Sequence, residues 1–436
     1  MTIPPSRRLW PAILLVLCLL PGIARAEEVR LLETEREAAE ARAEMVLDAR
    51  EEVLAGYFII GHDPFALTAL SLLRDAARRG VRVKVIVDDQ WNKIPEGVQA
   101  HLLQEGIEIR TYHPFRFSKL HWVPRRMHDK LMVTDGKVLL AGGRNIESPY
   151  FGLGPRQLGR RNYLDCDVQV WGETAAEARA YFLSLWDSGE VRKLAVQRPA
   201  AETTAAAREL DRHKAWLDAK ILEVRAAPQP TLEAPVAVEA VRFLHDPVGK
   251  KGRERGVGHE LLGLMDTARE SVVVESPYLV PSRAFRQGLV RARERGIRVR
   301  ILTNSLATTD NLFPQAGYAG AKKWLVRNGV ELWEYHGPEC LHTKAAVIDG
   351  ERVIVGSFNL DPRSEKLNTE LALVIESGPV AETLRQAMDS HLERAWRIDK
   401  RGMPEGENER YPGVPKRKVL KLRLLRLLAP FIRKQL

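Results

Sequence analysis

One line of sequence occurs twice in this chain of 436 residues, and the repetition limits what the chain can fold into. The first copy is "RMHDKLMVTDGKVLLAGGRN" at 126–145, and the second is "CLHTKAAVIDGERVIVGSFN" at 340–359. Both copies place His-x-Lys, an Asp-Gly pair between apolar runs, and a closing Asn at matched offsets. Asp-Gly between apolar runs is typical of a β-hairpin turn. We therefore expect two equivalent lobes, each containing this hairpin.

The sequence around each copy is duplicated as well. "RRGVRVKVIVDDQ" at 78–90 corresponds to "ERGIRVRILTNSL" at 294–306, and each predicts a helix end, a glycine stop and an alternating strand. "LLQEGIEIRTYHP" and "LVRNGVELWEYHGP" repeat the order of helix, glycine and strand. The interval between copies is too long for a solenoid. This order predicts an α/β fold with two duplicated lobes, each a mixed β-sheet flanked by helices.

The repeats divide the chain into segments. Residues 27–200 are predicted as the first repeat and residues 237–400 as the second. Between them, residues 201–236 are predicted to form a helix, from about 202 to 224, and an extended linker in "AAPQPTLEAP".

The N-terminus has the three parts of a secretory signal. Arg7 and Arg8 precede the apolar stretch "LWPAILLVLCLL", and 24–26 is a small-x-small cleavage site. The apolar stretch is short for a membrane span. Residues 1–26 are therefore predicted to be a signal peptide, with an uncleaved anchor as the alternative. The mature chain is then expected to be exported to the bacterial periplasm.

Most of the positive charge lies in the C-terminal tail. The net charge of +10 includes +3 from residues 1–26 and +8 from residues 411–436, which leaves −1 for residues 27–410. A body so close to neutral argues against nucleic acid as a partner. At helical spacing, one broad apolar face is predicted to contain Leu420, Leu424, Leu425, Leu427, Leu428, Phe431 and Ile432. Arg423, Arg426, Arg433 and Lys434 lie opposite, while Lys421 falls on the apolar side. Residues 401–436 are predicted to be a basic amphipathic tail that binds a membrane surface, and the alternative is a helix that docks its leucine face on the protein.

The His-x-Lys pairs are the predicted catalytic groups. Residues two apart in a strand share a face, so His128 with Lys130, and His342 with Lys344, should point into one cleft. A neutral imidazole is a competent nucleophile, and a second imidazole suits acid–base chemistry near pH 7.

The aspartates of the two Asp-Gly pairs have a structural explanation. Asp135 and Asp349 stand where the hairpin turns are predicted. We interpret them as turn residues of the repeated motif and not as catalytic groups.

The residues that close each copy are predicted to contact a phosphate. Small residues such as Gly143 allow a close approach of the backbone, and Asn145, Ser357 and Asn359 offer hydrogen-bond donors. Together with two lysines and backbone N–H groups, these donors could replace a metal ion around a phosphate. The sequence has no His-x-x-x-His pair with a carboxylate and no Cys-x-x-Cys pair, so no metal and no cofactor are predicted.

With both copies complete, the chain resembles the phospholipase D superfamily, and within it the bacterial cardiolipin synthases of the type C-like branch. The resemblance rests on His-x-Lys, Asp and Gly-Gly/Ser-x-Asn in both copies, with "YLDCDVQVWG" and "GSFNLDPRSEKLNTE" in support. It implies an active site at the interface of the lobes and a two-step displacement at phosphorus through a phosphohistidine. By this resemblance His128 is the nucleophile and His342 the acid–base group.

Each histidine is expected to donate its other N–H to a carboxylate, which fixes the tautomer. The candidates are Asp165 and Glu370, which occupy equivalent positions in the repeats, and Asp167 is a weaker competitor. Cys166 and Cys340 lie nearby, and their pairing is left open, with two buried thiols favoured over a disulfide.

The function expected from the resemblance is a phosphatidyl transferase that makes cardiolipin. The acceptor would be phosphatidylglycerol, and the donor phosphatidylglycerol or phosphatidylethanolamine. The alternatives are an exported hydrolase of the phospholipase D type, a nuclease, which the near-neutral body disfavours, and a non-catalytic membrane-binding protein, which the intact motifs argue against.

Overall fold

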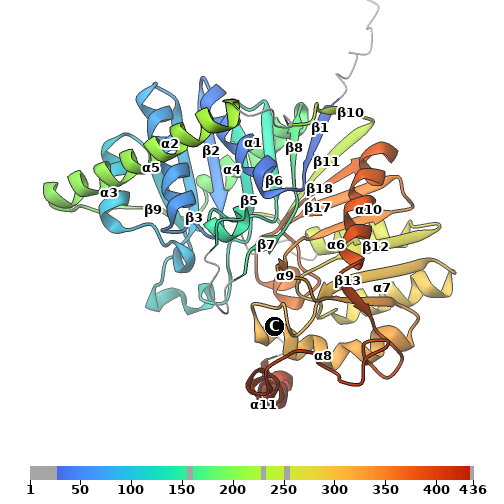
Figure 1. The fold of residues 1–436 in the computed structure, drawn as a ribbon. Coiled ribbons are helices and arrows are strands. Elements are labelled where there is room, and N and C mark those ends of the chain that lie inside the picture. The colour runs from blue at the N-terminus through green and yellow to red at the C-terminus, as the bar shows by residue number, and fades with distance from the viewer. Residues whose placement is uncertain (1–26, 155–160, 227–231, 250–255, 433–436) are drawn as a thin grey trace, which may run out of the picture.

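A computed structural model describes residues 27–154, 161–226, 232–249 and 256–432 as two lobes (Figure 1). The predicted signal peptide at 1–26 lies outside the described residues. Each lobe is built on one sheet. The first sheet contains, in spatial order, β10 (Val236–Val238), β1 (Glu27–Leu32), β8 (Asp167–Trp171), β6 (Val138–Gly142), β5 (Lys130–Thr134), β2 (Glu52–Tyr57), β3 (Arg82–Asp88), β4 (Glu108–Tyr112) and β9 (Val191–Lys193).

The second sheet repeats this order strand for strand, apart from β10. It contains β11 (Ala240–His245), β18 (Leu371–Glu376), β17 (Arg352–Gly356), β16 (Ala345–Ile348), β12 (Ser271–Glu275), β13 (Arg298–Asn304), β14 (Glu331–Tyr335) and β19 (Ala395–Arg397). Strands β2, β3 and β4 run parallel, as do β12, β13 and β14, and the flanking neighbours pair antiparallel. The predicted pair of mixed sheets is confirmed.

Helices cover the outer face of each sheet. On the first lobe these are α1 (Glu35–Asp48), α2 (Pro64–Arg78) and α3 (Glu96–Gln104), and on the second α6 (Val257–Asp266), α7 (Arg283–Glu294) and α8 (Leu312–Arg327). Equivalent helices start and stop alike. Asp63 caps α2 and Ser282 caps α7 through side-chain bonds to backbone N–H groups. Gly80 and Gly296 follow these helices with φ of +91° and +84°, a conformation that favours glycine.

The inner faces of the two sheets share one hydrophobic core. Helices α4 (Glu173–Trp186) and α10 (Gly378–Leu392) contribute to it, as do inward side chains of both sheets such as Leu54 and Val347. Successive side chains of a strand point to opposite faces of its sheet. In β2, Val53 therefore packs in the outer core of the first lobe, while Leu54 packs in the core that the two sheets share. The two lobes are thus joined through a common interior.

The segment between the repeats belongs mostly to the first lobe. The helix expected from about 202 to 224 is present as α5 (Ala200–Ala226), and it packs on α2 and α3. Strand β10 pairs with β1 of the first sheet, although the predicted second repeat begins at 237. The second sheet begins with β11. The first lobe therefore extends slightly beyond the predicted boundary, because β10 pairs with the edge of β1 through its backbone. Such backbone pairing leaves no pattern in the sequence.

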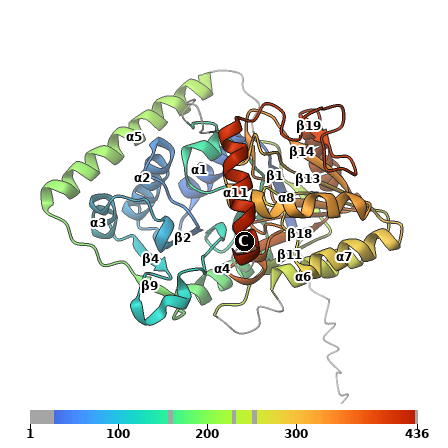
Figure 2. The ribbon, with the colours of Figure 1, turned by 90° about the horizontal axis from the view of Figure 1, so that it is seen from below.

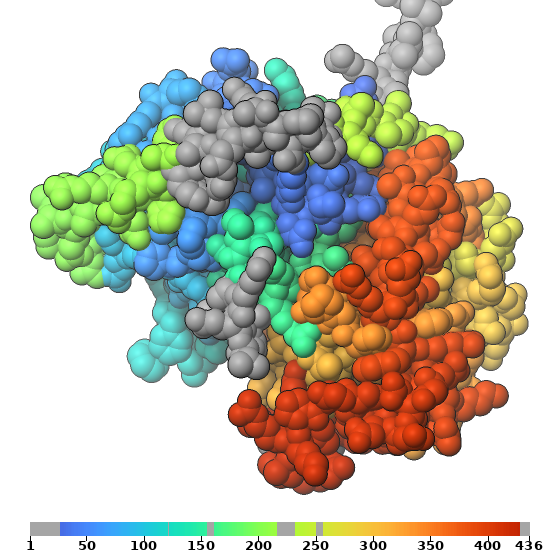
Figure 3. All heavy atoms as spheres, in the orientation of Figure 1, coloured from blue at the N-terminus to red at the C-terminus, as the bar shows by residue number. Residues whose placement is uncertain are grey.

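Two further elements lie close to the boundary between lobes. A short parallel ribbon joins β7 (Tyr163–Leu164) of the first lobe to β15 (Cys340–Leu341) of the second. The C-terminal helix α11 (Lys416–Ile432) packs on α8. Seen from below, α11 runs across the molecule where the two lobes meet (Figure 2). The C-terminal part of the chain forms the lower part of the face shown in Figure 3.

Candidate active site

Each His-x-Lys segment is positioned by the backbone of the other lobe. Next to the β7–β15 ribbon, the His342 N–H donates to the Leu164 carbonyl at 2.7 Å. At the equivalent place, the His128 N–H donates to the Thr369 carbonyl at 3.0 Å. Neither histidine is therefore placed by its own lobe alone.

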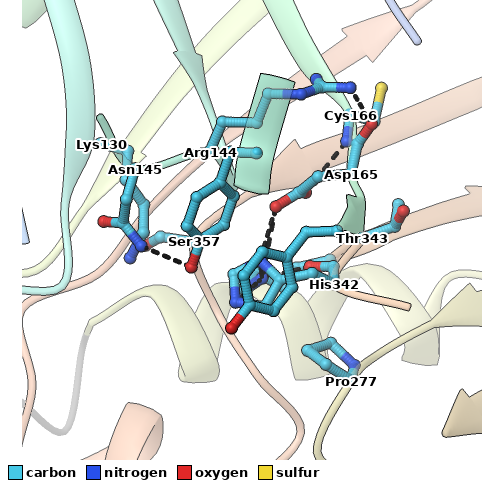
Figure 4. Close-up of polar contacts among 12 residues, drawn as sticks. Lys130, Arg144, Asn145, Asp165, Cys166, Pro277, His342, Thr343 and Ser357 are labelled. Atoms are coloured by element: carbon cyan, nitrogen blue, oxygen red, sulfur yellow. Dashed lines mark hydrogen bonds and ion pairs between the residues drawn. The ribbon is translucent and has the colours of Figure 1, made fainter. Parts of the chain in front are cut away.

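Each imidazole is hydrogen-bonded to a buried carboxylate of the other lobe. His128 Nδ1 lies 2.9 Å from Glu370 Oε2. His342 Nδ1 lies 2.5 Å from Asp165 Oδ2 (Figure 4). An ionised carboxylate only accepts hydrogen bonds, so the proton of each neutral ring sits on Nδ1. Each Nε2 then keeps its lone pair. The structure brings together the two predicted histidines and the two predicted carboxylates, in crossed pairs.

Burial keeps both imidazoles neutral at ordinary pH. Burial lowers the pKa of His128 to about 4, the Lys130 charge adds to this effect, and Glu370 opposes it. The pKa of His342 is lowered by burial and then by the Lys344 ammonium. A neutral imidazole with an unprotonated Nε2 is a competent nucleophile or base.

The two carboxylates stay ionised in spite of their burial. Burial by itself raises the pKa of Asp165, but Lys344 and His342 outweigh it, so that this pKa is lowered. Burial also raises the pKa of Glu370 by itself, but its contact with His128, the Lys130 charge and the Ser357 hydroxyl outweigh burial, so that this pKa is lowered. Ionised carboxylates hold the tautomer and also stabilise an imidazolium when it forms.

The two lysines lie beside their histidines, although neither is among the described residues that line the cavity containing both histidines. Lys130 Nζ donates to the His128 carbonyl at 2.6 Å, and Lys344 Nζ donates to the His342 carbonyl and lies 2.7 Å from His342 Nδ1. Burial lowers the pKa of Lys130 to about 7 and also lowers the pKa of Lys344. An anionic phosphate nearby would raise both values again, so the lysines are suited to binding one.

Asp129, which stands between His128 and Lys130, points to the opposite side. Its carboxylate accepts hydrogen bonds from Tyr181 Oη at 2.6 Å and from Thr369 Oγ1 at 2.8 Å. It therefore ties helix α4 to the second lobe and takes no part in the cleft.

Gly143 and Ser357 lie behind the carboxylates, which differs from the phosphate contact predicted for them. The Ser357 hydroxyl donates its one hydrogen to Glu370 and accepts the Leu371 N–H at 3.0 Å. A Cβ at Gly143 would lie 2.1 Å from Asp165 Oδ1. The backbone N–H groups of both residues are also bonded to carbonyls of the neighbouring strand. Both residues therefore support the carboxylates.

Asn145 and Asn359 do line the cleft that contains the histidines. Asn145 Oδ1 accepts the Ile59 N–H at 3.1 Å, and its Nδ2 donates to Tyr150 Oη at 2.9 Å. This uses one of the two amide hydrogens. Asn359 Oδ1 is buried without a hydrogen-bond partner among the described residues. These amides remain predicted phosphate contacts.

The cleft that contains the histidines is a cavity of about 660 Å³ with His128 and His342 in its wall. Its aromatic residues were missed by sequence reasoning. The Phe58 ring lies 5.0 Å from the His128 ring, and Tyr150 and Tyr163 lie 5.2 and 5.1 Å from the His342 ring. These rings exclude water around the imidazoles, which explains the low pKa values. Only the short spacing between Asn145 and Tyr150 could have pointed to one of them.

The turn aspartates connect each hairpin to a neighbouring strand. Asp135 and Asp349 have φ of +52° and +56° within their turns. Asp135 accepts the N–H groups of three successive residues that lead into β2, and Asp349 does the same for β12. Both lie in turns, where they were predicted, and they fix the starts of the strands beside the hairpins.

Asp167, the weaker candidate for orienting a histidine, lies elsewhere. It is fully buried and pairs with Arg144 at 3.1 Å and with Arg42 at 3.0 Å. Two cations bind this carboxylate, so it is not available to an imidazole. Cys166 and Cys340 are both buried free thiols.

Within the described residues, no cluster of His, Cys, Asp and Glu side chains has the arrangement of a metal site. Over the same ranges, no helix combines the length and the apolar character that a membrane span needs.

Helix α11 uses two of its faces differently. Leu422 is 1% exposed and packs with Val419 and Leu425 against the second lobe. Leu424 and Leu427 are 55% and 72% exposed. The docking expected as the alternative therefore occurs, but it uses Leu422, which the helical pattern had not singled out, and it leaves a leucine face uncovered.

Comparison with known proteins relates most of the chain to one group. A family model described as "Cardiolipin synthase, PLD-like domain" matches residues 44–186 and 261–393, one segment in each lobe. Cardiolipin synthase C of Escherichia coli (strain K12) is 32% identical over 411 residues, covering 84% of this chain and 85% of that protein. Cardiolipin synthase B of Salmonella typhi is 24% identical over 367 residues, covering 84% and 80% respectively.

A solved structure shares the fold. The crystal structure of phosphatidylserine synthase from Haemophilus influenzae Rd KW20 aligns with a TM-score of 0.68 and 16% identity, covering 95% of this chain and 98% of that one. At this identity the likeness concerns the arrangement of the two lobes.

Proposed function

The chain belongs to the cardiolipin synthase family of phospholipase D-like enzymes, and on that premise we propose that it transfers a phosphatidyl group between phospholipids through a phosphohistidine. One observation carries the proposal. Two neutral imidazoles, one from each lobe, line a single cleft, and each is held through Nδ1 by a carboxylate. This arrangement leaves two Nε2 atoms for chemistry at one phosphorus.

In the first step, His128 Nε2 attacks the phosphorus of the donor phosphodiester. The bond from phosphorus to the headgroup oxygen breaks, and that oxygen takes a proton from His342 Nε2. The negative charge of the bound phosphodiester raises the pKa of His342, which lets it hold this proton. Glycerol leaves when the donor is phosphatidylglycerol, and ethanolamine leaves when it is phosphatidylethanolamine.

In the second step, the headgroup hydroxyl of an acceptor phosphatidylglycerol gives its proton to His342. The hydroxyl oxygen attacks phosphorus, and the bond from phosphorus to His128 breaks. The product is cardiolipin. Lys130 and Lys344 stabilise the charge on the phosphate oxygens in both steps.

We also propose that α11 places the catalytic cleft at a membrane surface. Its exposed Leu420, Leu424 and Leu427 and its cations suit the interface of an anionic bilayer. Export to the periplasm is proposed from the sequence of residues 1–26 alone.

The decisive experiment incubates the purified protein with labelled phosphatidylglycerol, with and without phosphatidylethanolamine. Accumulation of cardiolipin is the expected result, and a gain on adding phosphatidylethanolamine identifies it as a donor. Phosphatidic acid as the sole product would instead establish a hydrolase. Cleavage of DNA with unchanged lipid would overturn both.

A further inference from the structure

A second cavity adjoins the catalytic cleft. It measures about 860 Å³ and shares Lys93, Glu147, Tyr163 and Asp310 with the cleft. Its other walls come from the first lobe at Arg161, from the loop of the second lobe that precedes Asp310, and from the start of α11. The two cavities are therefore neighbours with a common wall. We call it the basic cavity.

Cations dominate the described residues that line the basic cavity. Its two carboxylates are already engaged, because Glu147 pairs with Lys93 at 2.6 Å and Asp310 accepts the hydroxyls of Tyr163 and Tyr278. The remaining charged residues are Arg161, Arg417, Lys418 and Lys421. Four cations thus share the cavity with one carboxylate that is hydrogen-bonded to tyrosines.

Two of these cations are fixed by backbone carbonyls. Arg161 donates to the carbonyls of Gly337 and Pro338 at 2.8 and 2.9 Å, and Lys418 Nζ donates to that of Thr309 at 3.1 Å. Carbonyls hold a cation in place without neutralising its charge. Burial and the nearby Arg161 charge lower the pKa of Lys418. Like charges gathered in this way are suited to an anion that binds between them.

We propose that the basic cavity binds the phosphodiester of the acceptor phospholipid while its headgroup hydroxyl reaches the phosphohistidine. This assignment rests on the proposed transfer reaction, and it specifies where the acceptor lipid is bound while it reacts. The acceptor must keep its own phosphate intact, so that phosphate needs a site apart from the histidines. The leucine face of α11, on the helix that supplies three of the cations, sets this site at the depth of lipid headgroups.

The test measures how the phosphohistidine divides between lipid and water. In the double variant R417Q/K421Q, the phosphatidyl group is still formed on His128, but the acceptor binds less tightly and water competes better. We expect the ratio of cardiolipin to phosphatidic acid to fall by about tenfold or more, because two charge-assisted contacts to the acceptor phosphate are lost. Release of glycerol should fall much less, and excess short-chain phosphatidylglycerol should restore the ratio.

The matched control is R423Q/R426Q, which removes the same charge from α11 outside the basic cavity. Any weakening of membrane binding lowers both products together in both variants, so it leaves the ratio unchanged. A ratio in R417Q/K421Q equal to that of the control would overturn the acceptor site. A parallel fall of both products in R417Q/K421Q alone would assign the cavity to the donor lipid. If the unaltered protein made only phosphatidic acid, the proposed function itself would fail first.

Discussion

The two lobes present equivalent histidines and carboxylates but support them by different means. In the first lobe, Arg144 is fully buried and binds Asp167 together with three backbone carbonyls, including that of Asp165. The equivalent residue of the second lobe is Phe358, which packs against Phe285 with ring centroids 5.8 Å apart. An ionic network thus holds the backbone near Asp165, whereas apolar packing holds the equivalent part of the second lobe. The difference teaches that the site constrains the catalytic groups and leaves their support free to diverge.

The largest expected effect comes from removing one histidine at a time. His128→Ala and His342→Ala should each lower lipid turnover by at least about 10³-fold, since each removes a reacting group. With a phosphodiester whose leaving group is nitrophenolate, which departs without a proton, only His342→Ala should still give a burst of product. A burst in His128→Ala would reverse the roles of the lobes, and unchanged thermal unfolding would show that both variants fold.

Exchanging the carboxylates for amides should move the two limbs of the pH profile separately. The negative charge of Glu370 raises the pKa of His128, so Glu370→Gln should lower that pKa. The acidic limb of the profile, expected near pH 4, should therefore move to lower pH. Asp165→Asn lowers the pKa of the protonated His342, so the alkaline limb should move to lower pH. Turnover should fall by about 10²-fold in each. A shift of the same limb in both variants would show that the histidines do not have distinct roles.

Removing Arg144 in the first lobe should lower the free energy of unfolding more than replacing Phe358 in the second. Arg144→Leu deprives buried Asp167 of one of its two cations, and we expect a loss of about 3–5 kcal/mol in the free energy of unfolding. Phe358→Leu keeps an apolar contact and should cost about 1–2 kcal/mol. Urea unfolding measures both, and equal costs would contradict the ionic support of the first lobe.

The last prediction compares two leucines of α11, the helix that packs on α8 of the second lobe. Leu422→Ala should lower the free energy of unfolding by about 2–3 kcal/mol, because the Leu422 side chain is buried against the second lobe. Leu424→Ala should change stability by less than about 0.5 kcal/mol and yet weaken binding to anionic liposomes. Sedimentation with liposomes separates the two, and unaltered binding of Leu424→Ala would remove the exposed face from the membrane interface.

Local rules were enough to predict much of the fold and the positions of the reacting groups. The period of two in a strand placed His128 beside Lys130, and Asp-Gly located the turn at Asp135. Equivalence of the repeats selected Asp165 and Glu370. What the sequence did not contain was the crossing of these pairs between lobes, because that depends on how the shared core docks one sheet on the other.

The remaining differences arise where tertiary contacts decide the outcome. Ser357 had the right chemistry for a phosphate contact, but its single hydrogen goes to Glu370 in the folded chain. The leucines of α11 have no single helical stripe that separates docking from exposure, so Leu422 could be recognised only once α8 was in place. The basic cavity draws on segments far apart in sequence.

The β7–β15 ribbon has a consequence for how such a chain can evolve. It sets the residues before Asp165 and the residues before His342 in one common register. A single insertion in either segment would turn one side chain to the opposite face and separate His342 from Asp165. Changes of length in these two stretches are therefore tolerated only in compensating pairs, so the two halves of the duplication must inherit their spacing together.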